Sequence, residues 1–231
     1  MVLAIVSAIV LASATLTIGH EQDRPQGQGG FAGVGALRRM RGWLPLTAAY
    51  TSFGFMYLLV MAFLSTKLED DNGWTGARAS FAFTLVGFAV VIGGPMLIAL
   101  TNRFGARPAM TTAFLGWTAM VFAILPGWAP ATFPASFVIG LLFAGIPTTI
   151  TLYVVENTTV DDYGPAFAAA TLAFGIAQML GPQIGGLIAD AAGSFTPVFV
   201  LSAGLAVTGA VASWRLPTRA GDAVVDQVSG E

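Results

Sequence analysis

The sequence predicts an all-α, polytopic membrane protein with seven transmembrane helices, on the strength of its composition, its charge spacing and its residue types. Of 231 residues, 55% are hydrophobic and 10% are charged, against about 25% charged in soluble domains. Uncharged runs occupy 1–20, 42–66, 79–101, 108–155, 163–189 and 191–214. Each can cross a bilayer, since about 20 residues span a hydrocarbon core of about 30 Å. Continuous runs rich in Ala, Leu and Gly are typical of membrane helices and not of barrel strands.

The longest run predicts two helices. It is about twice the length of one span and contains Pro126, Gly127 and Pro130 near its middle, a pattern typical of a tight turn. The expected spans are 1–19, 44–66, 79–101, 108–126, 131–154, 165–190 and 196–214.

The first span allows a second interpretation, a cleaved signal peptide. It is short and contains Ala12-Ser13-Ala14, which resembles a signal-peptidase site. The absence of a basic start and the arginines that follow favour a spanning helix. The N-terminal end of this span is expected to lie on the outer side of the membrane and has no charged residue before it. This suggests that the chain begins in the middle of a longer protein.

Two polar stretches divide the chain. Residues 20–43 are rich in Gln, Gly and Arg, which is linker composition, and residues 215–231 form a polar tail. We therefore expect a helix at 1–19, a cytoplasmic linker at 20–43, a six-helix unit at 44–214 and a cytoplasmic tail at 215–231.

The basic residues predict the orientation, because Lys and Arg are retained on the cytoplasmic side. With the N-terminus outside, the outer loops hold only Lys67 and Arg78. The cytoplasmic segments then hold Arg24, Arg38, Arg39, Arg41, Arg103, Arg107, Arg215 and Arg219. We expect a multi-pass protein of the plasma membrane with a cytoplasmic C-terminus.

Several classes of function are excluded by the residue inventory. The chain has no cysteine, which removes disulfides and thiolate sites, and its net charge of −2 gives no basis for nucleic-acid binding. A retinal protein needs a lysine in its last helix, whereas Lys67 is predicted to lie in a loop. An intramembrane protease needs polar partners in the bilayer, whereas the sole histidine, His20, lies in the linker. We expect no enzymatic activity, cofactor or metal.

Glycine and proline cluster in three of the predicted spans. The clusters are Gly94-Pro95, Gly145 with Pro147, and Gly181-Pro182 with Gly185 and Gly186. Proline permits a kink and small residues permit close helix packing. These clusters predict helix breaks in a protein that bends. The hydroxyls of Thr148 and Thr149 can satisfy the carbonyls that Pro147 frees, or can face a polar cavity.

A short loop follows the span 79–101 and contains Asn102, Arg103, Gly105 and Arg107. Gly105 suits a turn whose backbone conformation is closed to other residues. Arginines at a membrane surface can anchor helices, or bind acidic partners or lipid phosphates.

These motifs resemble those of the major facilitator superfamily of transporters. In the six-helix unit, Asn-Arg-x-Gly-x-Arg follows the second helix and Gly-Pro-x-x-Gly-Gly lies in the fifth, as in one half of such a transporter. Asn102 stands where the family more often has Asp, and Ile98 where Gly is usual. The first helix, linker and tail resemble helix six, the central loop and the C-terminus, so the resemblance implies the C-terminal half. Residues 50–57 and 173–182 resemble the YbfB/YjiJ-like branch.

The resemblance implies transport of a small solute by alternating access between two halves. The cavity would be lined by 44–66 and 131–154, with Tyr50, Tyr57, Thr148, Thr149 and Gln178 as candidate contacts. Glu156 would be a cytoplasmic gate partner of Arg103 or Arg107.

The expected partners are the lipid bilayer, the solute, and a missing N-terminal half or a second copy of the chain. No titratable group is expected deep in the bilayer, so a proton site would lie in the other half. The alternative is a truncated or split membrane scaffold that does not transport without a separate N-terminal half.

Overall fold

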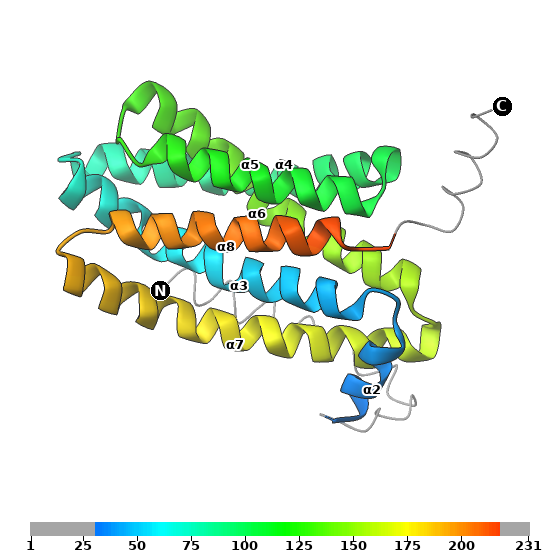
Figure 1. Cartoon of the computed structure of the whole chain (residues 1–231). Coiled ribbons are helices and arrows are strands. Elements are labelled where there is room, and N and C mark those ends of the chain that lie inside the picture. Colours follow the sequence, from blue (N-terminus) through cyan, green and yellow to red (C-terminus); the bar gives the residue numbers. More distant parts are fainter. Residues whose placement is uncertain (1–30, 218–231) are drawn as a thin grey trace, which may run out of the picture.

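The computed structural model describes residues 31–217, which form a bundle of long helices joined by short turns (Figure 1). The predicted helix at 1–19 and residues 218–231 lie outside the described residues. The described elements are α2 (Phe31–Arg39), α3 (Trp43–Thr66), the π-helical turn η1 (Lys67–Asp71), α4 (Gly76–Phe104), α5 (Ala106–Ile124), α6 (Ala129–Asn157), α7 (Val160–Ala192) and α8 (Thr196–Trp214).

Six long helices lie at the positions of the six predicted spans in this part of the chain. Five are long and apolar enough to cross a membrane, namely α3 with η1, α4, α6, α7 and α8. The remaining helix, α5, is as long as α8, at 19 residues. Arg107 and three threonines lower the hydropathy of α5.

The helices pack as two related groups of three. Helix α4 packs mainly on α6, and α7 packs on α3; α3 also packs on α8, α6 on α5, and α5 on α8. Exchanging α3-α4-α5 for α6-α7-α8 leaves this pattern unchanged, which is the signature of an internal repeat. In Figure 1, α3 accordingly lies beside α7 and α8, while α6 lies with α4 and α5.

Glycines bring α4 and α6 into backbone contact. The α-carbons of Gly93 and Gly140 face the carbonyls of Leu141 and Val86, at positions where a β-carbon would overlap the opposite backbone. Close approach of this kind stabilises helix pairs in lipid through packing.

The prolines of the three clusters do not interrupt their helices, and the predicted bending at these positions stays a prediction. Helices α4, α6 and α7 continue without interruption through Pro95, Pro147 and Pro182. Near Pro147 in α6, Thr148 donates to the Ala144 carbonyl at 2.8 Å and Thr151 to the Pro147 carbonyl at 2.9 Å. These acceptors are not the Phe143 carbonyl, which the proline leaves without its amide donor. Proline is tolerated because side chains and neighbouring helices stabilise the carbonyls that it frees.

The predicted linker contains a helix. Within 20–43, α2 buries Ala36 and Leu37 and packs against α7. The Gly-rich composition that predicted a linker serves this packing, because Gly33 lies against the Pro165 carbonyl where a β-carbon would approach to 2.6 Å.

The two ends of the bundle differ, and we name them by their basic residues. The lysine end contains η1 and the turns α5–α6 and α7–α8; the arginine end contains Arg39 to Arg41, the α4–α5 turn and Arg215. The prediction that Lys67 lies in a loop is wrong, because the α3 helix continues through η1 to Asp71.

Lys67 is 0% exposed, and its ammonium donates to Asn72 Oδ1 at 3.1 Å and to the Leu125 carbonyl at 3.2 Å. Its Nζ also lies 3.5 Å from Asp71 Oδ2. Asp71 in turn accepts hydrogen bonds from Ser194 Oγ at 2.9 Å and from the Phe195 amide at 3.0 Å. This buried network fastens the end of α3 to the end of α5 and to the start of α8.

Candidate functional site

An aromatic cluster fills the junction of α3, α6 and α7. Tyr50 stacks on Phe174 with ring centroids 4.4 Å apart, and Tyr57 lies 5.0 Å from both Phe53 and Phe143. The three α3 members are spaced by three and four residues, which places them on one helix face. Sequence reasoning missed Phe53, Phe143 and Phe174, although the spacing of Phe53 between Tyr50 and Tyr57 was a usable signal.

The polar centre of the cluster is a hydrogen bond between two predicted site residues. The Gln178 amide of α7 donates to the Tyr57 hydroxyl of α3, and both side chains are partly buried. An amide at membrane depth needs such a partner. Tyr50 joins the same group through its stacking on Phe174.

Thr148 and Thr149 lie elsewhere, where α6 packs against α4. Thr149 is fully buried; its hydroxyl donates to the Gly145 carbonyl at 3.2 Å and lies 3.2 Å from the Thr101 hydroxyl. Thr148 faces Gly94. The described hydrogen bonds of both threonines serve α6 and its contact with α4, and the structure does not bring them to the Tyr57–Gln178 pair.

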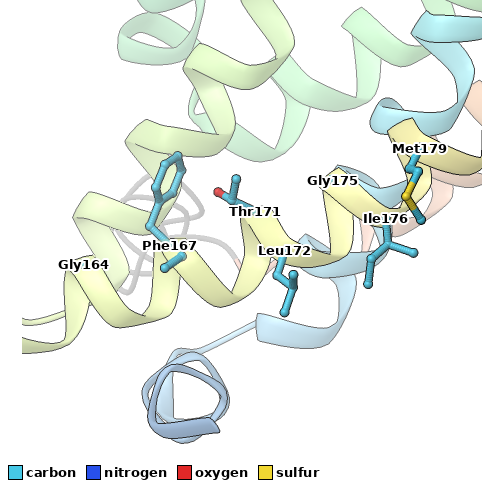
Figure 2. Close-up of a pocket in the computed structure, with 8 residues that line it drawn as sticks. Gly164, Phe167, Thr171, Leu172, Gly175, Ile176 and Met179 are labelled. Carbon is cyan, nitrogen blue, oxygen red and sulfur yellow. The ribbon is translucent and has the colours of Figure 1, made fainter. Parts of the chain in front are cut away.

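An open groove of about 600 Å³ runs along one face of α7 (Figure 2). The groove is lined by Gly164, Phe167, Ala168, Thr171, Leu172, Gly175, Ile176 and Met179. Its surface is almost entirely apolar, and Leu172 and Met179 are more than 60% exposed. The groove adjoins the aromatic cluster, since Phe167 stacks with Tyr50 at 6.5 Å.

The Gly181-Pro182 cluster contributes to the contact between α7 and α3. A β-carbon at Gly185 would approach the side chains of Phe63 to 2.7 Å and Leu59 to 2.8 Å, so a larger residue here would require these side chains to move. Gly181 lies at ordinary contact distance from Leu58, and Gly186 faces open space. The cluster is therefore a packing surface in this conformation.

The predicted gate loop turns sharply between α4 and α5. Gly105 has φ +88°, which confirms the expected conformation. The Arg103 guanidinium lies 5.2 Å from the centroid of the Phe104 ring, and that of Arg107 lies 4.3 Å from the Trp214 ring. Asn102 is exposed. The gate contact of these arginines with Glu156 stays a prediction.

An ion pair at the arginine end was not predicted. The Arg39 guanidinium of α2 donates to both carboxylate oxygens of Asp162 on α7, at 2.6 and 3.2 Å. These hydrogen bonds raise the pKa of Arg39 above its usual value. The Tyr153 hydroxyl of α6 donates to the Arg41 carbonyl at 3.1 Å, so α7 holds α2 and α6 holds the turn that follows it.

The chemistry of these sites is that of binding. Within residues 31–217, no group of three or more His, Asp or Glu side chains is arranged to hold a metal ion. The aromatic faces, one amide and the tyrosine hydroxyls can contact a solute through stacking and neutral hydrogen bonds.

Comparison with known proteins gives a consistent result. The sequence profile of the Major Facilitator Superfamily matches residues 46–229. Solute carrier family 22 member 18 of Rattus norvegicus is 30% identical over 170 residues, which cover 69% of this chain and 39% of the rat protein. The class C tetracycline resistance protein of Escherichia coli is 29% identical over 138 residues, covering 56% of this chain and 33% of that protein.

A solved structure shares the fold. The E. coli fucose:proton symporter superposes with a TM-score of 0.68 at 19% identity, over 93% of this chain and 54% of the symporter chain. The chain therefore spans well under half the length of the curated relatives that it matches and about half of a solved relative.

Proposed function

The chain belongs to the Major Facilitator Superfamily, and is thus a multi-pass membrane protein and not an enzyme; from this we propose that it forms the C-terminal half of a transporter for a small solute. Two observations support the proposal: the six helices α3 to α8 form two related groups of three, and the fold covers 54% of a solved symporter. The transporter works by alternating access, in which two halves rock around a central site.

The Tyr57–Gln178 pair carries the proposed solute site. It joins the first helix of one repeat to the second helix of the other, and aromatic rings surround it. A solute with a planar or apolar portion stacks on these rings and exchanges its hydrogen bonds with the Gln178 amide. Tyr50 belongs to this site, whereas Thr148 and Thr149 keep a cavity role only in a conformation that separates α4 from α6.

The missing partner is an N-terminal half, or a second copy of this chain. The exposed apolar groove of about 600 Å³ on α7 supports this, since concave apolar surfaces are typical of binding and interaction sites. In this arrangement residues 1–19 are helix six, 20–43 the central linker and 215–231 the cytoplasmic tail.

The arginine end faces the cytoplasm and the lysine end the outside of the plasma membrane. The positive-inside rule supports this orientation. Arg103 and Arg107 then lie at the cytoplasmic mouth, where Glu156 becomes their gate partner when the halves close.

The natural absence of cysteine makes this function directly testable. We would make two single variants, Thr171→Cys in the groove and Leu115→Cys on α5, where Leu115 is 50% exposed. Each is labelled with a membrane-impermeant thiol reagent in intact cells and in inverted vesicles. Each chain is expressed alone and together with the separate N-terminal half of a related transporter. Alternating access predicts that Thr171→Cys is labelled from both sides in the assembled protein, and that Leu115→Cys is labelled from neither.

Solute flux supplies the second measurement. Proteoliposomes are tested with tetracycline and L-fucose, solutes named for two relatives, and flux is expected only when both halves are present. Robust flux from a monomer of this chain alone would contradict the proposed half, and labelling of Thr171→Cys from one side only would favour the scaffold alternative. Arg41→Cys and Asp70→Cys, one at each end, test the orientation.

A further inference from the structure

A second hollow lies at the arginine end, away from the α7 groove. It has a volume of about 330 Å³ and is lined by Leu100 and Phe104 of α4 and by Pro108, Ala109 and Thr112 of α5. The two helices are joined by Gly105 alone, but each packs mainly against other helices, α4 on α6 and α5 on α8. They diverge as they leave the turn, and this leaves the hollow between them.

The lining of the hollow is apolar. Phe104 is 56% exposed beside it, and the Thr112 hydroxyl is already engaged with the Pro108 carbonyl at 2.8 Å. The hydroxyl proton of the lining's one threonine is thus already used. A hydrocarbon chain fits this surface better than water or an inorganic ion does.

Positive charge lies near the hollow. The Arg103 guanidinium lies 5.2 Å from the ring centroid of the lining residue Phe104, and Arg107, which precedes the lining residue Pro108 in the sequence, stacks on Trp214 of α8. The ion pairs described among residues 31–217, Arg39–Asp162 and Lys67–Asp71, involve neither arginine. Each guanidinium presents a face to an aromatic ring, which leaves its N–H edge for an acceptor. Helix α5 also begins here without a side-chain cap, so the positive end of its dipole adds to the attraction for an anion.

We propose that this hollow binds one anionic phospholipid of the surrounding leaflet. The lipid phosphate lies against Arg103, Arg107 and the first turn of α5, and an acyl chain fills the space between Phe104 and Thr112. The charge and the apolar lining together select a molecule that is both anionic and amphiphilic, and the position of the turn at the end of α4, a helix long and apolar enough to cross a membrane, places the site at headgroup level. A free phosphate would satisfy only the arginines.

Native mass spectrometry of the full chain tests this proposal. The chain in detergent is titrated with dioleoyl-phosphatidylglycerol, with dioleoyl-phosphatidylcholine, and with inorganic phosphate as competitor. We expect a preference for phosphatidylglycerol of at least roughly tenfold, and a loss of roughly fivefold in affinity for each arginine neutralised in Arg103→Gln and Arg107→Gln. The control Arg78→Gln is closely matched, because Arg78 stacks on Trp74 at the same 4.3 Å as Arg107 on Trp214, yet lies at the lysine end. It should bind phosphatidylglycerol like the parent chain.

The apolar half of the site has its own variants. Thr112 is exposed, so Thr112→Phe fills the hollow without disturbing the core, and it should weaken binding of both lipids. Leu115→Phe, one turn further along α5, should not. Equal binding of the two lipids, an equal effect of Arg78→Gln, or no effect of Thr112→Phe would overturn the proposal. Full competition by inorganic phosphate would assign the arginines to a free anion instead.

Discussion

Two helix contacts of this bundle occupy equivalent places in the repeat but differ in composition. Where α4 meets α6, the glycines Gly93 and Gly140 bring backbone against backbone, and the hydroxyls of Thr101 and Thr149 are closed inside. Where α7 meets α3, Gly54 and Gly185 also allow close approach, but aromatic rings and the Tyr57–Gln178 pair form much of the contact. Glycine contacts have few alternative arrangements, whereas rings and amides can repack around a guest. We infer that the α4–α6 contact is the rigid one and that the α3–α7 contact is the one that can rearrange.

The largest expected effect comes from forcing the glycine contact apart. Gly93→Leu places a side chain into the Leu141 backbone, whereas Gly87→Leu on the same helix meets open space. We expect Gly93→Leu to lower the free energy of unfolding by about 3 kcal/mol and Gly87→Leu to leave it nearly unchanged. Reversible unfolding in mixed micelles, followed by tryptophan fluorescence, gives both values. Similar values for the two variants would remove the distinction between the contacts.

The aromatic contact should tolerate truncation better. Phe174→Ala removes the ring on which Tyr50 stacks, and because Phe174 is only partly buried we expect a loss of about 2 kcal/mol, below the 3 to 5 of a full core position. Phe88→Ala, at a ring that is 68% exposed on α4, is the control and should change stability little. A loss at Phe174 equal to that of Gly93→Leu would mean that both contacts are equally rigid.

Polar pairs in the two contacts should be alike in strength and unlike in function. Double-mutant cycles of Tyr57→Phe with Gln178→Ala, and of Thr101→Val with Thr149→Val, are expected to give coupling energies of about 0.6 kcal/mol each. In the assembled transporter, Gln178→Ala should reduce solute flux, and Thr149→Val should not. A flux defect confined to Thr149→Val would move the solute site to the α4–α6 contact.

The smallest effect is expected outside both contacts, at the Arg39–Asp162 pair. The Arg39 side chain is 65% exposed, and exposed ion pairs contribute little and are screened by salt. Arg39→Gln should shift the thermal midpoint slightly at low salt and not at all at high salt. A large shift that persists in high salt would show that α2 is a structural part of the bundle.

Sequence reasoning located the six helices because uncharged length is a strong and local signal. It missed α2, whose stability depends on burying Ala36 and Leu37 against α7 and is invisible in a Gly-rich composition. It also placed Lys67 in a loop, although Lys67 and Asp71 are spaced as a helical ion pair. The first charged residue was interpreted as the end of the helix, whereas here the helix continues through Lys67 to Asp71 and both residues belong to a buried network.

The site was predicted in part. Gln178 and Tyr57 were recognised from residue type and depth, but their pairing spans 121 positions in the sequence and depends on how α3 meets α7. Thr149 has a hydroxyl that could line a cavity, but it lies against Thr101 of α4. Gly145 and neighbouring glycines allow α4 to pack closely against the face of α6 that carries Thr149. Polar residues in a membrane helix can thus be identified from sequence, whereas the face that they occupy is decided by packing.

The buried lysine also sets an order for assembly in the membrane. Lys67 finds its acceptors on Asn72 beside it and on Leu125, 58 residues later, and Asp71 is completed by Phe195, 124 residues later. Until α5 and α8 have been inserted, the end of α3 must keep its charge in water at the membrane surface. Helix α8 therefore completes the end of α3, and an intermediate in which α8 has not yet been inserted exposes an incomplete lysine end.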